Sequence, residues 1–205
     1  MRITFSDTGK RFNREWIFRN LSFDFLPGES YAITGPNGSG KSTVLQVISG
    51  SMAPSAGQIN WQLKNENVEV DHLFSHLTIS APYLETIEEL TAVEFLSFHN
   101  KFKKYIDDIS INEILDIVGL TKAADKQIRY FSSGMKQRIK LAQAIFCDVP
   151  LLLLDEPCTN LDTAGIELYH QLISRYAIGK TVIVSSNDQQ EYSFCKSIIN
   201  IMGYK

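Results

Sequence analysis

The sequence predicts an α/β fold with a mainly parallel sheet, an N-terminal antiparallel β lobe and a helical lobe inserted into the α/β core. Two short, wholly apolar segments late in the chain are typical of strands buried on both faces of a parallel sheet. The first third alternates apolar and polar residues, as half-buried strands do, and the middle has helical periodicity. The chain has 205 residues, 44% of them hydrophobic, and we expect residues 1–205 to form a single domain.

The antiparallel β lobe is predicted from the start of the chain. Residues 2–5 and 21–25 alternate apolar and polar side chains, and the pattern breaks at residues 27–28, which are Pro-Gly. A further strand pair is expected around residues 58–63. These segments predict strands joined by turns, ahead of the α/β core.

The inserted helical lobe is predicted at approximately residues 85–145. Phe95, Phe98, Phe102 and Tyr105 recur there at spacings of three and four, as on one face of a helix. We expect this aromatic stripe to face a core.

The α/β core is predicted from segments on both sides of that lobe. Residues 151–154 and 181–184 are the two apolar strands. Helices are expected over residues 42–49 and 163–177, each closed by a glycine soon after its last residue. Parallel strands need covering helices, and these segments supply them.

Composition excludes several classes of function. Twenty Lys and Arg against 23 Asp and Glu give a net charge of −3, so there is no basic footprint for nucleic acid and we expect no nucleic-acid partner. The three cysteines lack any C-x-x-C pair, which disfavours a disulfide framework and suits a cytoplasmic location. No stretch approaches the ~20 apolar residues of a membrane span, so work at a membrane would require a partner.

A glycine-rich loop follows the strand-like residues 30–34. Residues 35–42 read G-P-N-G-S-G-K-S and match the pattern G-x-x-x-x-G-K-[ST] at every fixed position. Glycines let successive backbone N–H groups turn inward around a phosphate, and the helix N-terminus adds partial positive charge. Lys41 would reach the β and γ oxygens, and Ser42 would offer its hydroxyl to Mg²⁺. The loop therefore predicts a P-loop NTPase core that binds a nucleotide.

Two adjacent carboxylates end the apolar strand at 151–154. Asp155 and Glu156 fall at the carboxyl edge of the sheet, where ligands of α/β proteins collect. Neighbouring strand positions point in opposite directions, so the two acids should have different tasks. Asp155 can hold Mg²⁺ through its water shell, and Glu156 can polarise the attacking water as general base.

A third element, residues 131–138, reads F-S-S-G-M-K-Q-R and enters a helix. With Ser132 or Ser133 as the N-cap, free N–H groups and the helix dipole would face a phosphate that the first loop does not hold. Alone, such an entry is an ordinary N-cap. Its position between the Lys41 loop and the Asp155 strand favours a second anion site.

In this order the motifs resemble those of the nucleotide-binding subunit of an ATP-binding cassette (ABC) transporter, and the resemblance covers essentially the whole chain. It extends the phosphate loop to Thr43 and adds a D-loop-like segment, residues 159–162, that ends in Asp162. It implies ATP and Mg²⁺ as cofactors. It also places Phe12 where an aromatic ring stacks on adenine, with Trp16 as the second candidate and a core aromatic as the alternative.

Three departures from the family pattern bear on mechanism. The usual L-S-G-G-Q is F-S-S-G-M here, which keeps the serine, Ser132, and the second glycine, Gly134. No glutamine occurs at residues 81–83, where the family has one at the junction of core and helical lobe. The family's histidine after the strand at 181–186 is Asn187, whose amide can donate to the γ-phosphate but carries no charge. We therefore expect slower hydrolysis.

The resemblance implies an ATPase subunit that closes head to tail over ATP with a second copy of itself or a homologous ATPase subunit, and drives a separate transmembrane permease subunit. It would lie in the cytoplasm, peripheral on the inner face of the cell membrane through that partner. Two alternatives are a soluble P-loop kinase and a nucleotide-gated binding module with weak hydrolysis. The predicted catalytic residues are Lys41, Glu156 and Asn187; the predicted metal ligands are Ser42 and Asp155; and the predicted nucleotide contacts are Phe12, Gly35, Asn37, Gly38, Ser39, Gly40, Lys41, Ser42, Thr43, Ser132, Ser133, Gly134 and Asp162.

Overall fold

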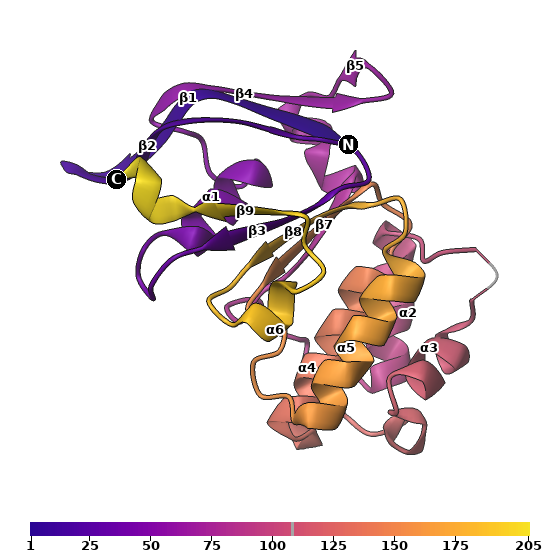
Figure 1. The fold of residues 1–205 in the computed structure, drawn as a ribbon. Helices are drawn as coiled ribbons and strands as arrows, with labels where there is room; N and C mark the ends of the chain where they lie inside the picture. The colour runs from indigo at the N-terminus through magenta and orange to yellow at the C-terminus, as the bar shows by residue number, and fades with distance from the viewer. Residues whose placement is uncertain (108) are drawn as a thin grey trace. The chain divides into compact units, whose positions relative to one another are not determined.

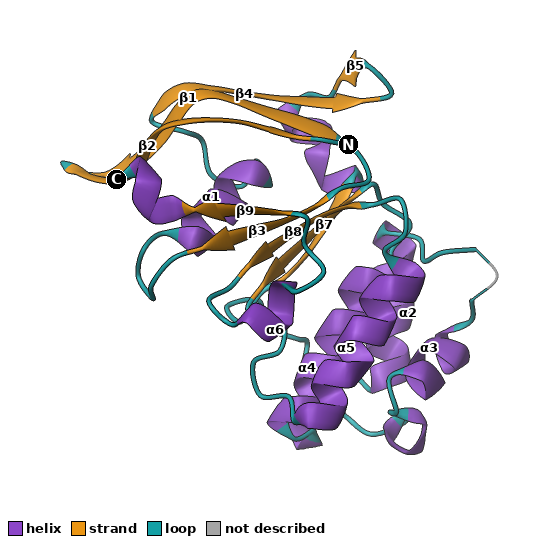
Figure 2. Ribbon diagram, in the orientation of Figure 1, coloured by secondary structure: helices purple, strands orange, loops and turns teal. Residues whose placement is uncertain are grey.

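The structure is a computed structural model that describes residues 1–107 and 109–205 (Figures 1 and 2). The chain divides into two compact units. The first comprises Met1–Leu77, Val149–Glu156 and Gly179–Lys205, and the second comprises Thr78–Asp148 and Pro157–Ile178. The predicted helical lobe, apart from residue 108, which lies outside the described residues, falls within the second unit.

The first unit contains the predicted antiparallel β lobe. Its four strands lie in the order β2-β1-β4-β5, with bounds Glu15–Phe25, Arg2–Phe12, Ala56–Leu63 and Glu66–Asn67. Ile3 pairs with Phe25 on one side and with Trp61 on the other, and all three side chains are buried. The alternation that predicted these strands therefore places one face of the sheet on a core.

The same unit contains the parallel sheet of the α/β core. Strands β7 (Leu151–Asp155), β8 (Thr181–Ser185), β3 (Ser30–Thr34) and β9 (Ser197–Asn200) lie side by side in that order, and each neighbouring pair is parallel. Every residue of β7 and β8 is buried, as their apolar sequences predicted. Strand β6 (Leu77–Ser80) spans the point where the chain passes into the second unit.

Short helical segments complete the first unit. Helix α1 (Lys41–Ile48) contacts β7 and β8, and the indole Nε1 of Trp61 donates to the Ile48 carbonyl at 2.8 Å, so α1 lies between the two sheets (Figure 1). The remaining segments are the 3₁₀ turn η1 (Val70–Ser75), the short helix α6 (Gln189–Tyr192) and the 3₁₀ turn η4 (Ile201–Tyr204).

The strand order brings three sequence motifs to one edge of the parallel sheet. Strand β3 runs into the glycine-rich loop, β7 ends at Asp155, and β8 is followed closely by Asn187. Because β7, β8 and β3 are parallel neighbours, their carboxyl ends meet at the same edge. The motifs predicted from distant parts of the sequence are therefore neighbours in this unit.

The second unit is helical. It contains α2 (Ala92–Phe102), α3 (Ile111–Ile117), α4 (Ser133–Ile145) and α5 (Thr163–Tyr176), with 3₁₀ turns at Thr121–Ala123 and Ile128–Tyr130. Thr91 and Ser110 cap α2 and α3 in reciprocal capping boxes, which explains where these helices begin. Among the described residues, no helix is long and apolar enough to cross a membrane.

The predicted aromatic stripe is partly wrong. Phe95 and Tyr105 are buried, but Phe98 and Phe102 are 45% and 72% exposed, and their rings contact each other edge to face at 5.0 Å. The buried face of α2 is formed by Ala92, Phe95 and Leu96. That face is rotated away from Phe98 and Phe102, and Tyr105 lies beyond the last residue of the helix.

Candidate functional site

The glycine-rich loop has the backbone conformation that its sequence predicts. Gly38 and Gly40 have φ values of 77° and 99°, in the left-handed region that favours glycine. A Cβ atom at Gly40 would overlap the side chain of Ile17, whereas nothing lies within 4 Å of a Cβ placed at Gly38. The loop is therefore packed against β2 on one side and open on the other.

Lys41 provides a buried cation at the base of this loop. Its side chain is 5% exposed, and Nζ donates to the carbonyl oxygens of Gly35 at 2.9 Å and Pro36 at 3.4 Å. Among the described residues, no carboxylate forms an ion pair with it. A buried charge balanced only by carbonyl dipoles gains from an anionic ligand, so the loop fits a phosphate group.

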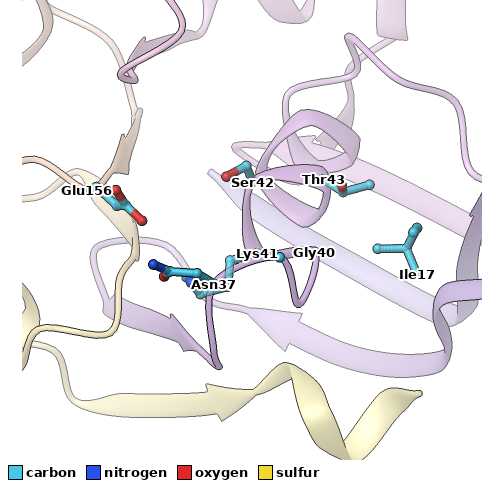
Figure 3. Close-up of a pocket in the computed structure, with 8 residues that line it drawn as sticks. Ile17, Asn37, Gly40, Lys41, Ser42, Thr43 and Glu156 are labelled. Atoms are coloured by element: carbon cyan, nitrogen blue, oxygen red, sulfur yellow. The ribbon is translucent and has the colours of Figure 1, made fainter.

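A cavity of about 280 Å³ lies over the loop (Figure 3). In that view Glu156 and Ile17 stand on opposite sides of the loop residues. The sequence reasoning missed Ile17, because its contact with Gly40 joins distant positions and no local pattern marks it. The lining residues are Ile17, Asn37, Gly38, Gly40, Lys41, Ser42, Thr43 and Glu156.

Asp155 is buried at the end of β7 with an unused acceptor. The residue is 3% exposed, and its Oδ1 has no hydrogen-bond partner among the described residues. The buried hydroxyls of Ser39 and Ser185 likewise lack a partner there, and Ser185 pairs with Asp155 across the strands. Unpaired buried oxygens of this kind suit a hydrated Mg²⁺ ion, which prefers carboxylate, hydroxyl and water ligands.

Glu156 follows Asp155 but has a different environment. Its φ of 45° is in the left-handed region, which is uncommon for a residue other than glycine, and its N–H donates to the Ser185 carbonyl at 2.9 Å. Glu156 is half-buried and lines the cavity, whereas Asp155 is buried. The two carboxylates therefore have separate environments, while their assigned tasks stay predictions.

Asn187 contacts the phosphate loop directly. Its Oδ1 accepts from the Gly35 N–H at 3.1 Å, and its Nδ2 donates to Oδ1 of Asn37 at 3.3 Å. The amide thus bridges the first and third residues of the loop. Its predicted contact with a γ-phosphate stays a prediction.

The second unit contains the other predicted half of the site. Ser132 is the N-cap of α4 and accepts from the Met135 N–H at 3.3 Å, so of the two candidates it is Ser132 that caps the helix, and Ser133 is its first residue. Nearby, Asp162 caps α5, and its Oδ1 lies 3.6 Å from Nη2 of Arg138. A cavity of about 300 Å³ is lined by Ser132, Gly134, Met135, Arg138, Asn160, Leu161 and Asp162.

Phe12 lies at the end of β1 and is 46% exposed. The Nζ of Lys10 lies 5.5 Å from the centre of its ring, and Phe12 is not among the described residues that line the 280 Å³ cavity. The second candidate, Trp16, has the guanidinium of Arg11 5.6 Å from its ring. Adenine stacking by either ring stays a prediction.

The segment that lacks the expected glutamine has another polar neighbour. Nζ of Lys140 on α4 lies 3.5 Å from the carbonyl oxygens of Ala81 and Pro82, and burial lowers the pKa of Lys140 below its usual range. The sequence reasoning missed Lys140, because its contacts join distant positions of the chain and no local pattern marks them.

Comparisons with known proteins agree with this arrangement. The family model described as ABC transporter matches residues 18–159. The ABC transporter ATP-binding protein YcbN of Bacillus subtilis (strain 168) is 33% identical over 87% of this chain, and the chain spans 59% of that protein. The cytochrome c biogenesis ATP-binding export protein CcmA of Xylella fastidiosa (strain 9a5c) is 33% identical over 78% of this chain, which spans 71% of it.

A solved structure gives the same result for the fold. The dimeric structure of MJ0796, a bacterial ABC transporter cassette, superposes with a TM-score of 0.80 and 26% identity, over 97% of this chain and 94% of that one. The predicted fold class is confirmed by this likeness. Since the family model matches more than half of its residues, this chain belongs to the ABC transporter family.

Proposed function

We propose that residues 1–205 form one cassette that binds and hydrolyses ATP with Mg²⁺ and drives a separate transmembrane permease subunit. The observation that carries the proposal is Lys41, a buried cation without a carboxylate partner among the described residues, which lines one cavity with Glu156. The positive-φ glycines of the loop support a phosphate in that cavity.

In this proposal the loop binds the phosphates of ATP. Backbone N–H groups around Gly38 to Lys41 surround the β-phosphate, and the ammonium of Lys41 moves from loop carbonyls to the β and γ oxygens. Ser42 and Asp155 hold Mg²⁺, which when bound offsets the negative charge on the phosphates. Ile17 lines the cavity on the side opposite Glu156 (Figure 3).

Glu156 acts as the general base. Its side chain lines the cavity that Lys41 also lines, so it can accept a proton from a water aligned with the γ-phosphate. Asn187 donates a neutral hydrogen bond to that phosphate and supplies no charge, so hydrolysis is slower than with a histidine at this position.

The cassette works as a pair, with a second copy or a homologous ATPase subunit. The helix start at Ser132, with Gly134 and Asp162, lines a cavity of its own and would cap the ATP held by the other cassette. The dimeric MJ0796 structures, one of them a post-hydrolysis state bound to ADP and Pi, support this assembly.

The partner subunit would hold this cassette at the inner face of the cell membrane, in the cytoplasm. The CcmA relative is named as an export protein, which supports export as the direction of transport.

The kinase alternative has no support among the comparisons. The weakly hydrolysing binding module is favoured by one observation, the uncharged Asn187 beside the loop.

Single-turnover incubation with γ-labelled ATP, with and without membranes that contain the permease, tests the proposal. The expected result is free phosphate released by the wild type and none by Glu156→Gln, with a faster rate in the presence of the partner. Bound ATP that stays intact would support the binding module, and label on a small molecule would support a kinase.

A further inference from the structure

The end of the described chain lies against the phosphate loop. Nζ of Lys205 donates to the carbonyl oxygen of Ser39, in the middle of the loop, at 2.7 Å and to that of Ile17 on β2 at 2.9 Å. In Figure 1 the yellow C-terminal segment, which includes η4, lies beside β2, and β2 and η4 are in contact. One ammonium group therefore joins the loop to a residue that lines the cavity.

Neighbouring contacts hold this segment in place. Ile201 is fully buried, and a Cβ atom at Gly35 would lie 2.6 Å from its Cγ2. Nε of Arg19 on β2 donates to the main-chain oxygen of Lys205 at 3.0 Å. The segment thus packs against the first residue of the loop through Ile201 and reaches its fifth residue, Ser39, through Lys205.

The ammonium group of Lys205 interacts with the carbonyl oxygens of Ser39 and Ile17. Among the described residues it forms no ion pair with a carboxylate. The described chain contains no cis peptide bond, so the Ser39 C=O and the Gly40 N–H of one planar peptide point in opposite directions. With the C=O fixed on the ammonium, the Gly40 N–H points away from Lys205. Hydrogen bonding at one end of a peptide polarises it and strengthens the donor at the other end.

We propose that Lys205 is a positioning residue for nucleotide binding, which fixes and polarises the Ser39–Gly40 peptide so that the loop is ordered before ATP enters. This inference rests on the proposed function where it concerns ATP. Its other consequence, an ordered loop in the nucleotide-free chain, can be measured without ATP.

The experiment compares wild type, Lys205→Met and Lys205→Arg in the full chain. Met removes the donor and keeps most of the side-chain length, while Arg keeps the charge and several donors. The matched control is Lys196→Met, which removes an exposed lysine just before β9 that pairs with Glu29 at 2.7 Å, at the end of β3 away from the loop. All four proteins are measured for amide hydrogen exchange, thermal unfolding, and the KM and kcat for ATP.

In Lys205→Met, we expect faster exchange at the amides of Ser39 and Val44, which bond to Pro36 and Gly40 within the loop and first helical turn. We also expect the KM for ATP to rise by about 3- to 10-fold, the scale of the net contribution of one ordinary hydrogen bond, with kcat unchanged. Lys205→Arg should restore both readouts, and Lys196→Met should change neither. If Lys205 only stabilised the fold, its replacement by Met would lower kcat and the unfolding temperature and leave KM unchanged.

The outcomes separate this inference from the proposed function. If Lys205→Met has the same amide exchange rates and the same KM as the wild type, the positioning role is overturned, while the proposed ATP hydrolysis is not affected. Faster exchange with an unchanged KM would overturn its link to the nucleotide. A wild type that neither binds nor hydrolyses ATP would refute the proposed function, and the exchange data would still decide whether Lys205 orders the loop.

Discussion

The side-chain oxygen of Asn187 accepts a hydrogen bond from the backbone N–H of Gly35 at 3.1 Å, so a residue two positions after the end of β8 holds the first residue of the phosphate loop. The same amide donates to Asn37, another loop residue. A histidine at this position would have a charged form near neutral pH, whereas an asparagine amide keeps both bonds at every physiological pH. Asn187 therefore supports the loop with a side chain that does not titrate.

Asn187→His should introduce a pH dependence that the wild type lacks at this position. The steady-state ATPase rate of the variant should show an additional inflection at about pH 6.5, the ordinary pKa of histidine, and exceed the wild-type rate. Rates measured from pH 5.5 to 8.5 give the comparison, with Asn187→Ala as a control for loss of the loop contacts. Parallel profiles for the histidine variant and the wild type would contradict a phosphate contact at this position.

Lys41→Ala should abolish detectable nucleotide binding. The substitution removes a buried cation that has no carboxylate partner among the described residues, and contacts of a charged donor with phosphate oxygens contribute roughly 1.5–3 kcal/mol each. Calorimetric titration with ATP measures the loss, and Lys122→Ala, which alters an exposed lysine in a 3₁₀ turn, is the control. Undiminished affinity in Lys41→Ala would refute the assigned loop.

Glu156→Gln should trap an ATP-bound dimer. Glutamine keeps the size of the side chain but cannot accept the proton of the attacking water, so ATP persists and the closed pair accumulates. Light scattering with Mg-ATP should report twice the monomer mass for this variant and not for Glu66→Gln, which changes an exposed acid on β5. A variant that remains monomeric would count against the paired cassette.

The second unit should become less stable in acid because of His99. Burial, with a smaller contribution from the nearby charge of Lys103, lowers the pKa of His99 from 6.5 to about 4. Folding therefore favours the neutral form, and this contribution to stability is fully present above about pH 6.5 and is lost as the pH falls toward 4. His99 lies 3.8 Å from the sulfur of Cys147 through its Nδ1, and its ring stacks on Tyr105.

Urea unfolding of wild type and His99→Gln at pH 7.5, 6 and 4.5 measures this effect. Between the highest and lowest pH, the free energy of unfolding should fall further in the wild type than in the variant, since glutamine does not titrate. Equal losses in both proteins would show that other groups account for the acid sensitivity.

Local sequence patterns were sufficient to predict the positions of several elements. The glycine-rich loop, the apolar strands β7 and β8, and the helices α1 and α5 were located within one or two residues, because each has a short-range signature in spacing or composition. The prediction for the aromatic stripe was partly wrong, since the spacing of aromatic residues does not show which face of the helix packs on the rest of its unit. Phe98 and Phe102 are exposed.

The residues of this chain by themselves determined a phosphate-binding loop, a pair of acids at a strand end and a serine-capped helix, because those features depend on neighbours in the sequence. Only the tertiary structure decided that Ile17, Asn187 and Lys205 contact the same loop. Their contacts follow from strand order and from the path of the chain after β9, which bring distant positions together. No spacing in the sequence encodes such contacts, since the packing of whole elements produces them.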